Sequence, residues 1–169
     1  MGWTDPDLGD FAVDEEITAA KMDTYVKDNL SWLGIDRPHC QVRDASLSPS
    51  TGSWVNPSWD AITTNVGSMA GSGNAYVQAP GAGFYLVGAS AVHAANSTAG
   101  VRGLMLSSSS GGGGTVYAQS NTTQHTSNDS GLTVVTMVQL GAGSSVYAAV
   151  FTSGGNVTNI RMWAIWMTA

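Results

Sequence analysis

The chain has 169 residues, a length that fits one ordinary domain with a short appendage. Only 11% of the residues are charged and 43% are hydrophobic, which excludes a chain kept disordered by its own charge. The formal net charge of -6 argues against nucleic-acid binding, because that function needs a basic surface. No apolar run approaches the roughly 18 residues of a membrane span, so we expect no membrane insertion.

The first ten residues and the cysteine content bear on where the chain folds. Met1–Asp10 is acidic and lacks the apolar core of a signal peptide, so we expect synthesis in a cytoplasm. The single cysteine, Cys40, excludes an internal disulfide framework. We expect this residue to be a small buried side chain rather than a reactive thiol.

The charge is concentrated at the N-terminal end. Residues 1–44 hold ten of the 12 acidic and four of the six basic residues, and this difference accounts for the whole net charge. The break predicts two parts, an arm with one helix over residues 1–38 and a separate domain over residues 39–169. A domain so poor in charge either hides surface in an assembly or covers it with small polar residues.

The N-terminal part is predicted to be an extended arm, Gly2–Val13, followed by one helix from about Thr18 to Leu33. Either Asp14 or Thr18 can cap the start of the helix, and Gly34 is a natural stop. Its apolar stripe, with helical spacing, consists of Met22, Tyr25, Val26, Leu30 and Leu33. This stripe packs either on the chain's own domain or against copies of itself or a larger structure. We favour the second interpretation and predict that these residues attach the protein to its partner.

The remainder is predicted to be all β, as a sandwich, jelly roll or barrel, because short strands alternate with Gly, Pro and Asn turns. The expected strands are Gln41–Leu47, Ser53–Trp59, Ala75–Gln78, Phe84–Ala94, Val101–Ser108, Val116–Ser120, Leu132–Leu140, Val146–Thr152 and Ile160–Thr168.

Several of these strands are apolar on both faces, for example Val146–Phe151 and Ile160–Met167. A two-layer sandwich buries only one face of each strand. The second face therefore needs another cover, either further subunits around a symmetry axis or a loop or helix of the same chain.

One set of motifs resembles the complement globular-head and tumour-necrosis-factor-like jelly roll. The residues that carry the resemblance are Ser53–Val55, Trp59–Asp60, Asn65 and Ala79–Val87, followed by Asn96, Gly100–Arg102 and Leu104, which are similar to phage versions of the domain. The resemblance covers residues 41–169 and implies a ten-stranded antiparallel jelly roll that forms homotrimers through apolar faces. The Gly-rich stretch Ser107–Gly114 departs from the family pattern and leaves a ligand face unspecified.

The N-terminal segment resembles the opening of short tail and fibre proteins of tailed phages. The matching residues are Phe11, Glu16–Asp23, Val26–Leu30 and Leu33. The resemblance implies an attachment helix, and together with a trimeric jelly roll it implies a protein at the virion surface.

The resemblance also implies which strands line the subunit contact. The predicted trimer interface comprises Tyr85, Val87, Ala89, Tyr147, Ala149, Phe151, Trp163 and Ile165. We expect Tyr85 and Tyr147 to lie near the threefold axis, with Trp163 and Ile165 as the next candidates.

The sequence gives no catalytic signal, and we expect no enzyme activity and no cofactor. Beyond residue 44, only Asp60 and Asp129 could complete a nucleophile triad, and no acidic loop cluster suggests calcium. His93 is in phase with Tyr85, so three copies could bind an ion at an axis, or the residue could be a hydrogen-bonded histidine at a strand end.

Three functions fit these observations. The first is a homotrimeric minor tail, tail-tip or fibre-type protein that contacts the host surface, with host-surface glycan as a candidate ligand. The second is a capsid decoration protein that stabilises the shell. The third is a non-viral carbohydrate- or protein-binding module of the same fold.

Overall fold

The computed structural model describes residues 18–31, 36–70, 75–97, 100–123 and 126–168. The chain divides into two compact units, Met1–Arg37 and Pro38–Ala169. The predicted arm, the alternative cap Asp14 and the stripe residue Leu33 lie outside the described residues. No helix in the described ranges is long and apolar enough to cross a membrane.

The N-terminal unit contains the predicted helix in three consecutive segments, α1 (Ala19–Met22), the π-helical turn η2 (Asp23–Lys27) and α2 (Asp28–Ser31). Thr18 caps it, because its hydroxyl accepts a hydrogen bond from the backbone N–H of Lys21. The π turn was not foreseen. Met22, Val26 and Leu30 are 47%, 42% and 63% exposed, so the apolar stripe has no full cover within the described residues.

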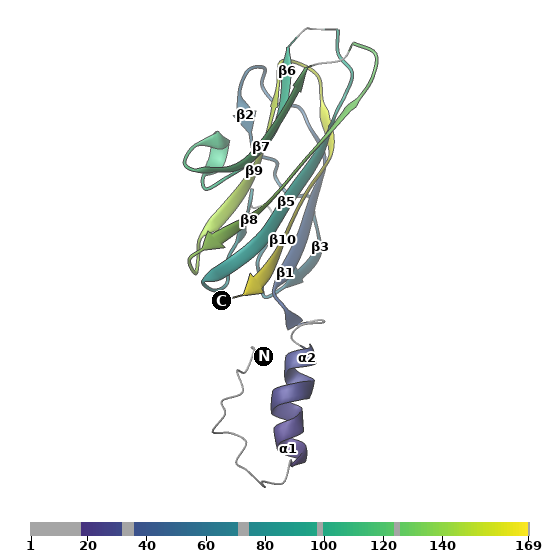
Figure 1. Ribbon diagram of the computed structural model, residues 1–169. Coiled ribbons are helices and arrows are strands. Elements are labelled where there is room, and N and C mark those ends of the chain that lie inside the picture. The colour runs from purple at the N-terminus through teal and green to yellow at the C-terminus, as the bar shows by residue number, and fades with distance from the viewer. Residues whose placement is uncertain (1–17, 32–35, 71–74, 98–99, 124–125, 169) are drawn as a thin grey trace. The chain divides into compact units, whose positions relative to one another are not determined.

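The second unit is a two-layer sandwich of antiparallel strands (Figure 1). The first sheet has the order β3-β1-β10-β5-β8, formed by Ala61–Val66, His39–Leu47, Val157–Thr168, Gly83–His93 and Ser130–Leu140. The second sheet has the order β2-β9-β6-β7, formed by Trp54–Val55, Ser145–Thr152, Val101–Ser107 and Val116–Thr123, and β4 (Tyr76–Gln78) also pairs with β9.

Each of the nine predicted strands corresponds to a strand of the structure, and a tenth, β3, was missed. The predicted strand Ser53–Trp59 was too long, since only Trp54–Val55 pair, with Phe151 and Val150 of β9. Beyond them the chain leaves the sheet at Pro57, which has no N–H to give to a ladder. Trp59 is nevertheless buried in the core.

The core fills the space between the sheets, and strand alternation explains which side chains enter it. On β5 and β10, for example, Val87, Ala89 and Met162 are almost fully buried while their neighbours along the strand face outward. Leu104 and Val150 meet them from the second sheet.

One end of the sandwich is tied together by a buried arginine. Arg102 on β6 is fully buried and donates hydrogen bonds to the carbonyl oxygens of His93 (3.1 Å) and Ala94 (2.6 Å) and to the hydroxyl of Ser130 (3.1 Å). One guanidinium therefore links β6 of the second sheet to the end of β5 and the start of β8 in the first.

Replacing Arg102 by Met is expected to destabilise the domain, because each carbonyl left without a donor costs about 1–3 kcal/mol. Urea denaturation followed by tryptophan fluorescence measures the loss. Arg161→Met on the exposed face of β10 is the matched control and should change the free energy of unfolding much less. Equal effects of the two variants would contradict the bridging role of Arg102.

Candidate functional site

The outer face of the first sheet carries a continuous apolar surface centred on β5. Leu86 lies between Met137 of β8 and Ile165 of β10 in the strand register. One pair further along, Gly88 lies between Val135 and Trp163. The side chains of Val135 and Met137 are 51% and 64% exposed, so this surface, here called the β5 face, has no cover within the described residues.

The indole of Trp163 lies against the bare backbone of Gly88. A Cβ atom at Gly88 would stand 2.1 Å from Cζ2 of Trp163, too close for any side chain. The missing side chain at Gly88 leaves room for the Trp163 ring.

The predicted trimer-interface residues lie in three different places. Tyr85, Val87 and Ala89 are buried inside the sandwich, so the expectation that they line a subunit contact chose the wrong phase of β5. Trp163 and Ile165 lie half-buried on the β5 face. Tyr147, Ala149 and Phe151 lie on the outer face of the other sheet, and their place in a subunit contact stays a prediction.

Tyr85 has a structural role in the core. Its ring stacks on that of Trp166, with centroids 6.0 Å apart and an angle of 10° between the planes. Its hydroxyl donates a 2.7 Å hydrogen bond to the carbonyl of Gly81, and burial raises its pKa. The expected position beside a threefold axis is therefore wrong for Tyr85, because its ring and its hydroxyl both make contacts inside the same chain.

The second face of β9 is partly covered by the chain itself. Ala149 is fully buried and pairs with Met105 of β6, and the Gly-rich loop folds back over this position. At Gly112, in the short 3-10 turn η4 (Ser110–Gly112), a Cβ atom would lie 2.4 Å from Cε of Met105. The sequence predicts either further subunits or a loop or helix of the same chain as the cover of the second face of β9. At Ala149 the cover is the Gly-rich loop.

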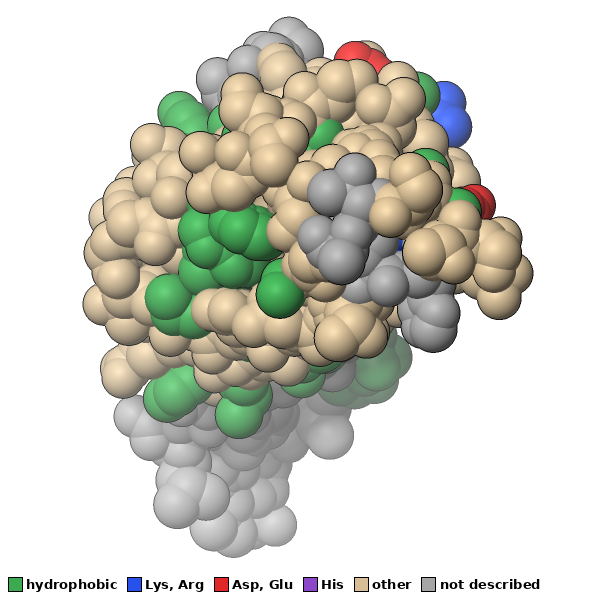
Figure 2. Space-filling model, turned by 90° about the horizontal axis from the view of Figure 1, so that it is seen from above, with side chains coloured by type: hydrophobic (Ala, Val, Ile, Leu, Met, Phe, Trp, Pro, Cys, Tyr) green, Lys and Arg blue, Asp and Glu red, His purple; other side chains and the backbone are tan. Residues whose placement is uncertain are grey.

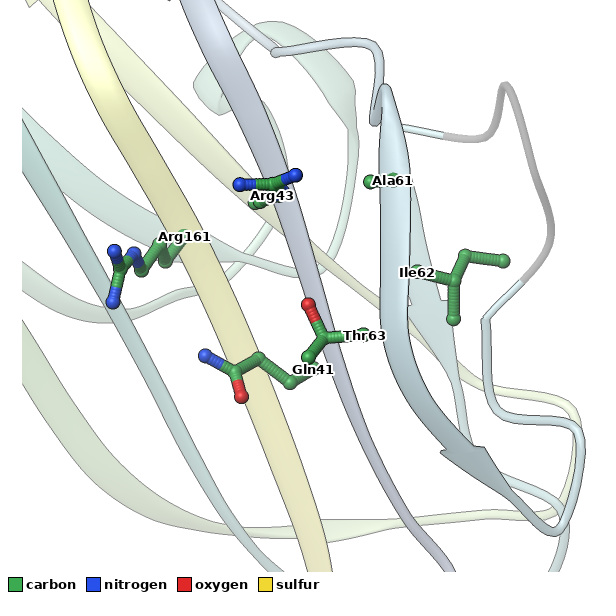
Figure 3. Close-up of a pocket in the computed structure, with 6 residues that line it drawn as sticks. All are labelled: Gln41, Arg43, Ala61, Ile62, Thr63 and Arg161. Atoms are coloured by element: carbon green, nitrogen blue, oxygen red, sulfur yellow. The ribbon is translucent and has the colours of Figure 1, made fainter.

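A hollow of about 400 Å³ on the outer side of β3, β1 and β10 holds two arginines (Figure 3). Arg43 and Arg161 are directly opposite partners in the β1–β10 ladder. Neither has an ion-pair partner among the residues that the structure describes. Like charges at this spacing are mutually unfavourable, so the hollow is suited to an anionic group such as a carboxylate.

His93 is an interior residue and not part of a surface ion site. It is 1% exposed, and neither ring nitrogen makes a hydrogen bond of normal geometry. The pKa of His93 is lowered to about 4, mainly by burial and also by the nearby Arg102 cation, while the backbone of Gly103 acts in the opposite direction. The imidazole is therefore neutral at pH 7.

Cys40 is also an interior residue. It is 2% exposed, and burial raises the pKa of its thiol to about 12, with a small opposing effect of the Ala164 backbone. The thiol is therefore protonated at neutral pH, as expected for a buried structural cysteine. In the described ranges, no three His, Cys, Asp or Glu residues are grouped to hold a metal.

The fold is similar to those of several solved structures, although no protein-family model and no curated protein matches the sequence. Murine APRIL (crystal structure at pH 8.0) has a TM-score of 0.59 and 10% identity, covering 78% of this chain and 99% of that chain. The globular domain of zebrafish complement 1qA has a TM-score of 0.56 and 12% identity, covering 78% and 97%. Eiger TNF from S. frugiperda has a TM-score of 0.56 and 12% identity, covering 78% and 94%.

These likenesses show the fold alone. The domain is a TNF/C1q-like jelly roll, mainly β, with ten antiparallel strands in two sheets. The fold class predicted from the sequence is confirmed.

The buried neutral His93 predicts a loss of stability in acid. Its folded-state pKa is about 4 against an ordinary value of 6.5, so the unfolded chain binds the proton first as pH falls. The contribution is fully present above pH 6.5 and is lost between there and about pH 4, by roughly 3 kcal/mol.

Chemical denaturation of the wild type and His93→Leu at pH 7 and pH 4 measures this loss. The variant should lose roughly 3 kcal/mol less than the wild type on acidification. The difference between the two proteins is needed because Asp44, whose pKa is raised by burial, acts in the opposite direction in both. Parallel pH profiles would contradict a buried neutral imidazole.

Proposed function

We propose that the chain is a non-enzymatic structural protein of a tailed-phage virion, a homotrimer displayed at the particle surface. In this proposal it is a minor tail, tail-tip or fibre-type protein whose jelly roll contacts the host. The observation that carries the self-association is the exposed apolar β5 face, which a lone soluble domain would rarely present to water.

The β5 face has the properties of a subunit contact. It is contiguous in register across β10, β5 and β8, and Trp163 supplies an aromatic ring of the kind enriched in interfaces. The resemblance to the jelly-roll family implies homotrimers formed through apolar faces, which fits this arrangement.

The charge of the domain also favours assembly. Residues 38–169 contain three acids and three bases, so their formal net charge is zero. Three copies therefore meet without net repulsion between them. Figure 2 shows one view of the surface, on which charged side chains are few and hydrophobic ones gather in patches.

The attachment role is proposed for the N-terminal helix. Met22, Val26 and Leu30 form an exposed apolar stripe, and a helix of this length is marginal in water without tertiary packing. The sequence resemblance to phage tail and fibre proteins supplies the proposed partner, another virion protein. The side chain of Tyr25 and the whole of Leu33 lie outside the described residues, and their role stays a prediction.

The trimer is tested by two exposed valines on opposite sheets. Val135→Glu places a charge on the β5 face and is expected to give particles of one chain, 17.4 kDa, instead of three. Val116→Glu is the matched control, since Val116 is 45% exposed on β7 against 51% for Val135. Sedimentation velocity measures both. A wild type that sediments as a stable monomer at micromolar concentration would sink the proposal.

The attachment role is tested by removing the N-terminal unit. A chain that starts at Pro38 is expected to fold and to trimerise, because the sandwich contains its own core. It should fail to join particles when supplied in place of the full chain, as measured by immunogold imaging of purified virions. Label on the head shell with the full chain would overturn the tail assignment in favour of shell decoration. Aggregation of the shortened chain would show that the helix belongs to the core.

A further inference from the structure

We infer that the outer face of the second sheet carries a binding site for neutral pyranose sugars. The site is a hollow of about 330 Å³, at the lower end of the range of about 300–1,000 Å³ for small-molecule pockets. It is lined by Trp54, Gly100, Val101, Gln119, Asn121, Phe151 and Ser153. This inference deepens the proposed contact with the host surface and rests on that function for its biological meaning.

Two aromatic rings form the apolar wall of the hollow. Trp54 and Phe151 are opposite partners in the β2–β9 ladder, with ring centroids 5.4 Å apart and planes tilted by 50°. Both are half-buried, so part of each ring faces the hollow. An exposed indole face beside a second ring offers the weakly negative surface on which the C–H groups of a pyranose pack.

The indole of Trp54 is held in place by glycines on either side. A Cβ atom at Gly103 would lie 2.6 Å from Cη2 of Trp54, and one at Gly112 would lie 3.1 Å from its Cγ. The ring is thus seated between strand β6 and the Gly-rich loop. Asn56 secures that loop, because its Oδ1 accepts a 2.6 Å hydrogen bond from Gly111 while its Nδ2 donates to the carbonyl of Ala148. A rigid wall reduces the entropy lost on binding.

Free hydrogen-bonding groups line the opposite side. Gln119 and Asn121 are exposed at alternate positions of β7, on the face that lines the hollow. Within the described residues neither amide has a hydrogen-bond partner, and neither does the indole N–H of Trp54. Each amide offers a donor and an acceptor side by side, which matches the adjacent hydroxyls of a sugar ring.

The charge of the hollow restricts the class of sugar. None of its seven lining residues is ionisable in the physiological range. Burying an unpaired carboxylate or phosphate there would be costly, so neutral hexoses and N-acetylhexosamines are preferred over acidic sugars. The hollow lies on the sheet opposite the β5 face, so a trimer formed through the β5 face leaves three such sites free to bind a surface together.

Saturation-transfer NMR on the full chain tests the site. The probes are methyl β-galactoside, methyl α-mannoside, methyl β-glucoside and N-acetylglucosamine, each at millimolar concentration, with glucuronate as the charged comparison. Transfer to the ring protons of at least one neutral sugar, and less to glucuronate, is expected. No transfer to any of the four neutral sugars would overturn the inference.

Two variants and a control locate the binding. Asn121→Ala and Phe151→Leu should each weaken the affinity about tenfold, the effect of one lost hydrogen bond or apolar contact. Thr123→Ala, exposed two positions further along β7 and outside the hollow, should leave it unchanged. Thermal melts establish that each variant is folded. Equal weakening in all three variants, or in none, would contradict this site.

The outcome is separable from that of the proposed assembly. A single sugar binds one chain, so Val135→Glu should keep the binding even where it abolishes the trimer. If the wild type is a monomer that binds sugar, the binding site is supported and the proposed trimer is contradicted. If it is a trimer that binds no sugar, the trimer is supported and the binding site is contradicted.

Discussion

The pairing of β5 with β10 in the middle of the first sheet leaves an apolar surface on each side of that sheet. Both strands carry apolar side chains on both faces of the sheet along much of their length. The second sheet covers one face through residues such as Leu104 and Val150. The other face, with Leu86 and Trp163, has no cover within the described residues, and the proposed self-association rests on this observation.

Much of the fold could be predicted because turn residues separate the strands clearly. Strand β3 was missed because it follows the Pro57–Asp60 segment with only one apolar pair, Ala61 and Ile62, at its start. It is an edge strand on β1 with mostly exposed side chains, so no alternation marks it. The π turn was likewise invisible, since it changes hydrogen bonding without changing which residues are apolar.

The candidate surfaces were harder to predict than the strands. On β5, Tyr85 and Val87 alternate with Phe84 and Leu86, and all four are apolar, so the pattern cannot say which pair faces inward. Tertiary packing decides which pair faces inward. The ring of Tyr85 stacks on that of Trp166, and its hydroxyl donates a hydrogen bond to the carbonyl of Gly81. The hollow beside Trp54 and Phe151 brings together residues that are far apart in the sequence, and no local sequence pattern predicts it.

The Gly-rich loop, which departs from the family pattern, explains why the two sheets have different outer faces. Gly111, Gly112 and Gly114 adopt positive φ angles, which lets the loop turn back sharply on itself. Its close approach at Gly112 seals Met105 and Ala149 and steadies Trp54. The first sheet has no such loop among its described residues, and its apolar face stays open. One sheet is thereby partly covered by its own chain and left with a small polar-rimmed hollow, while the other keeps the broad apolar surface on which the proposed association rests.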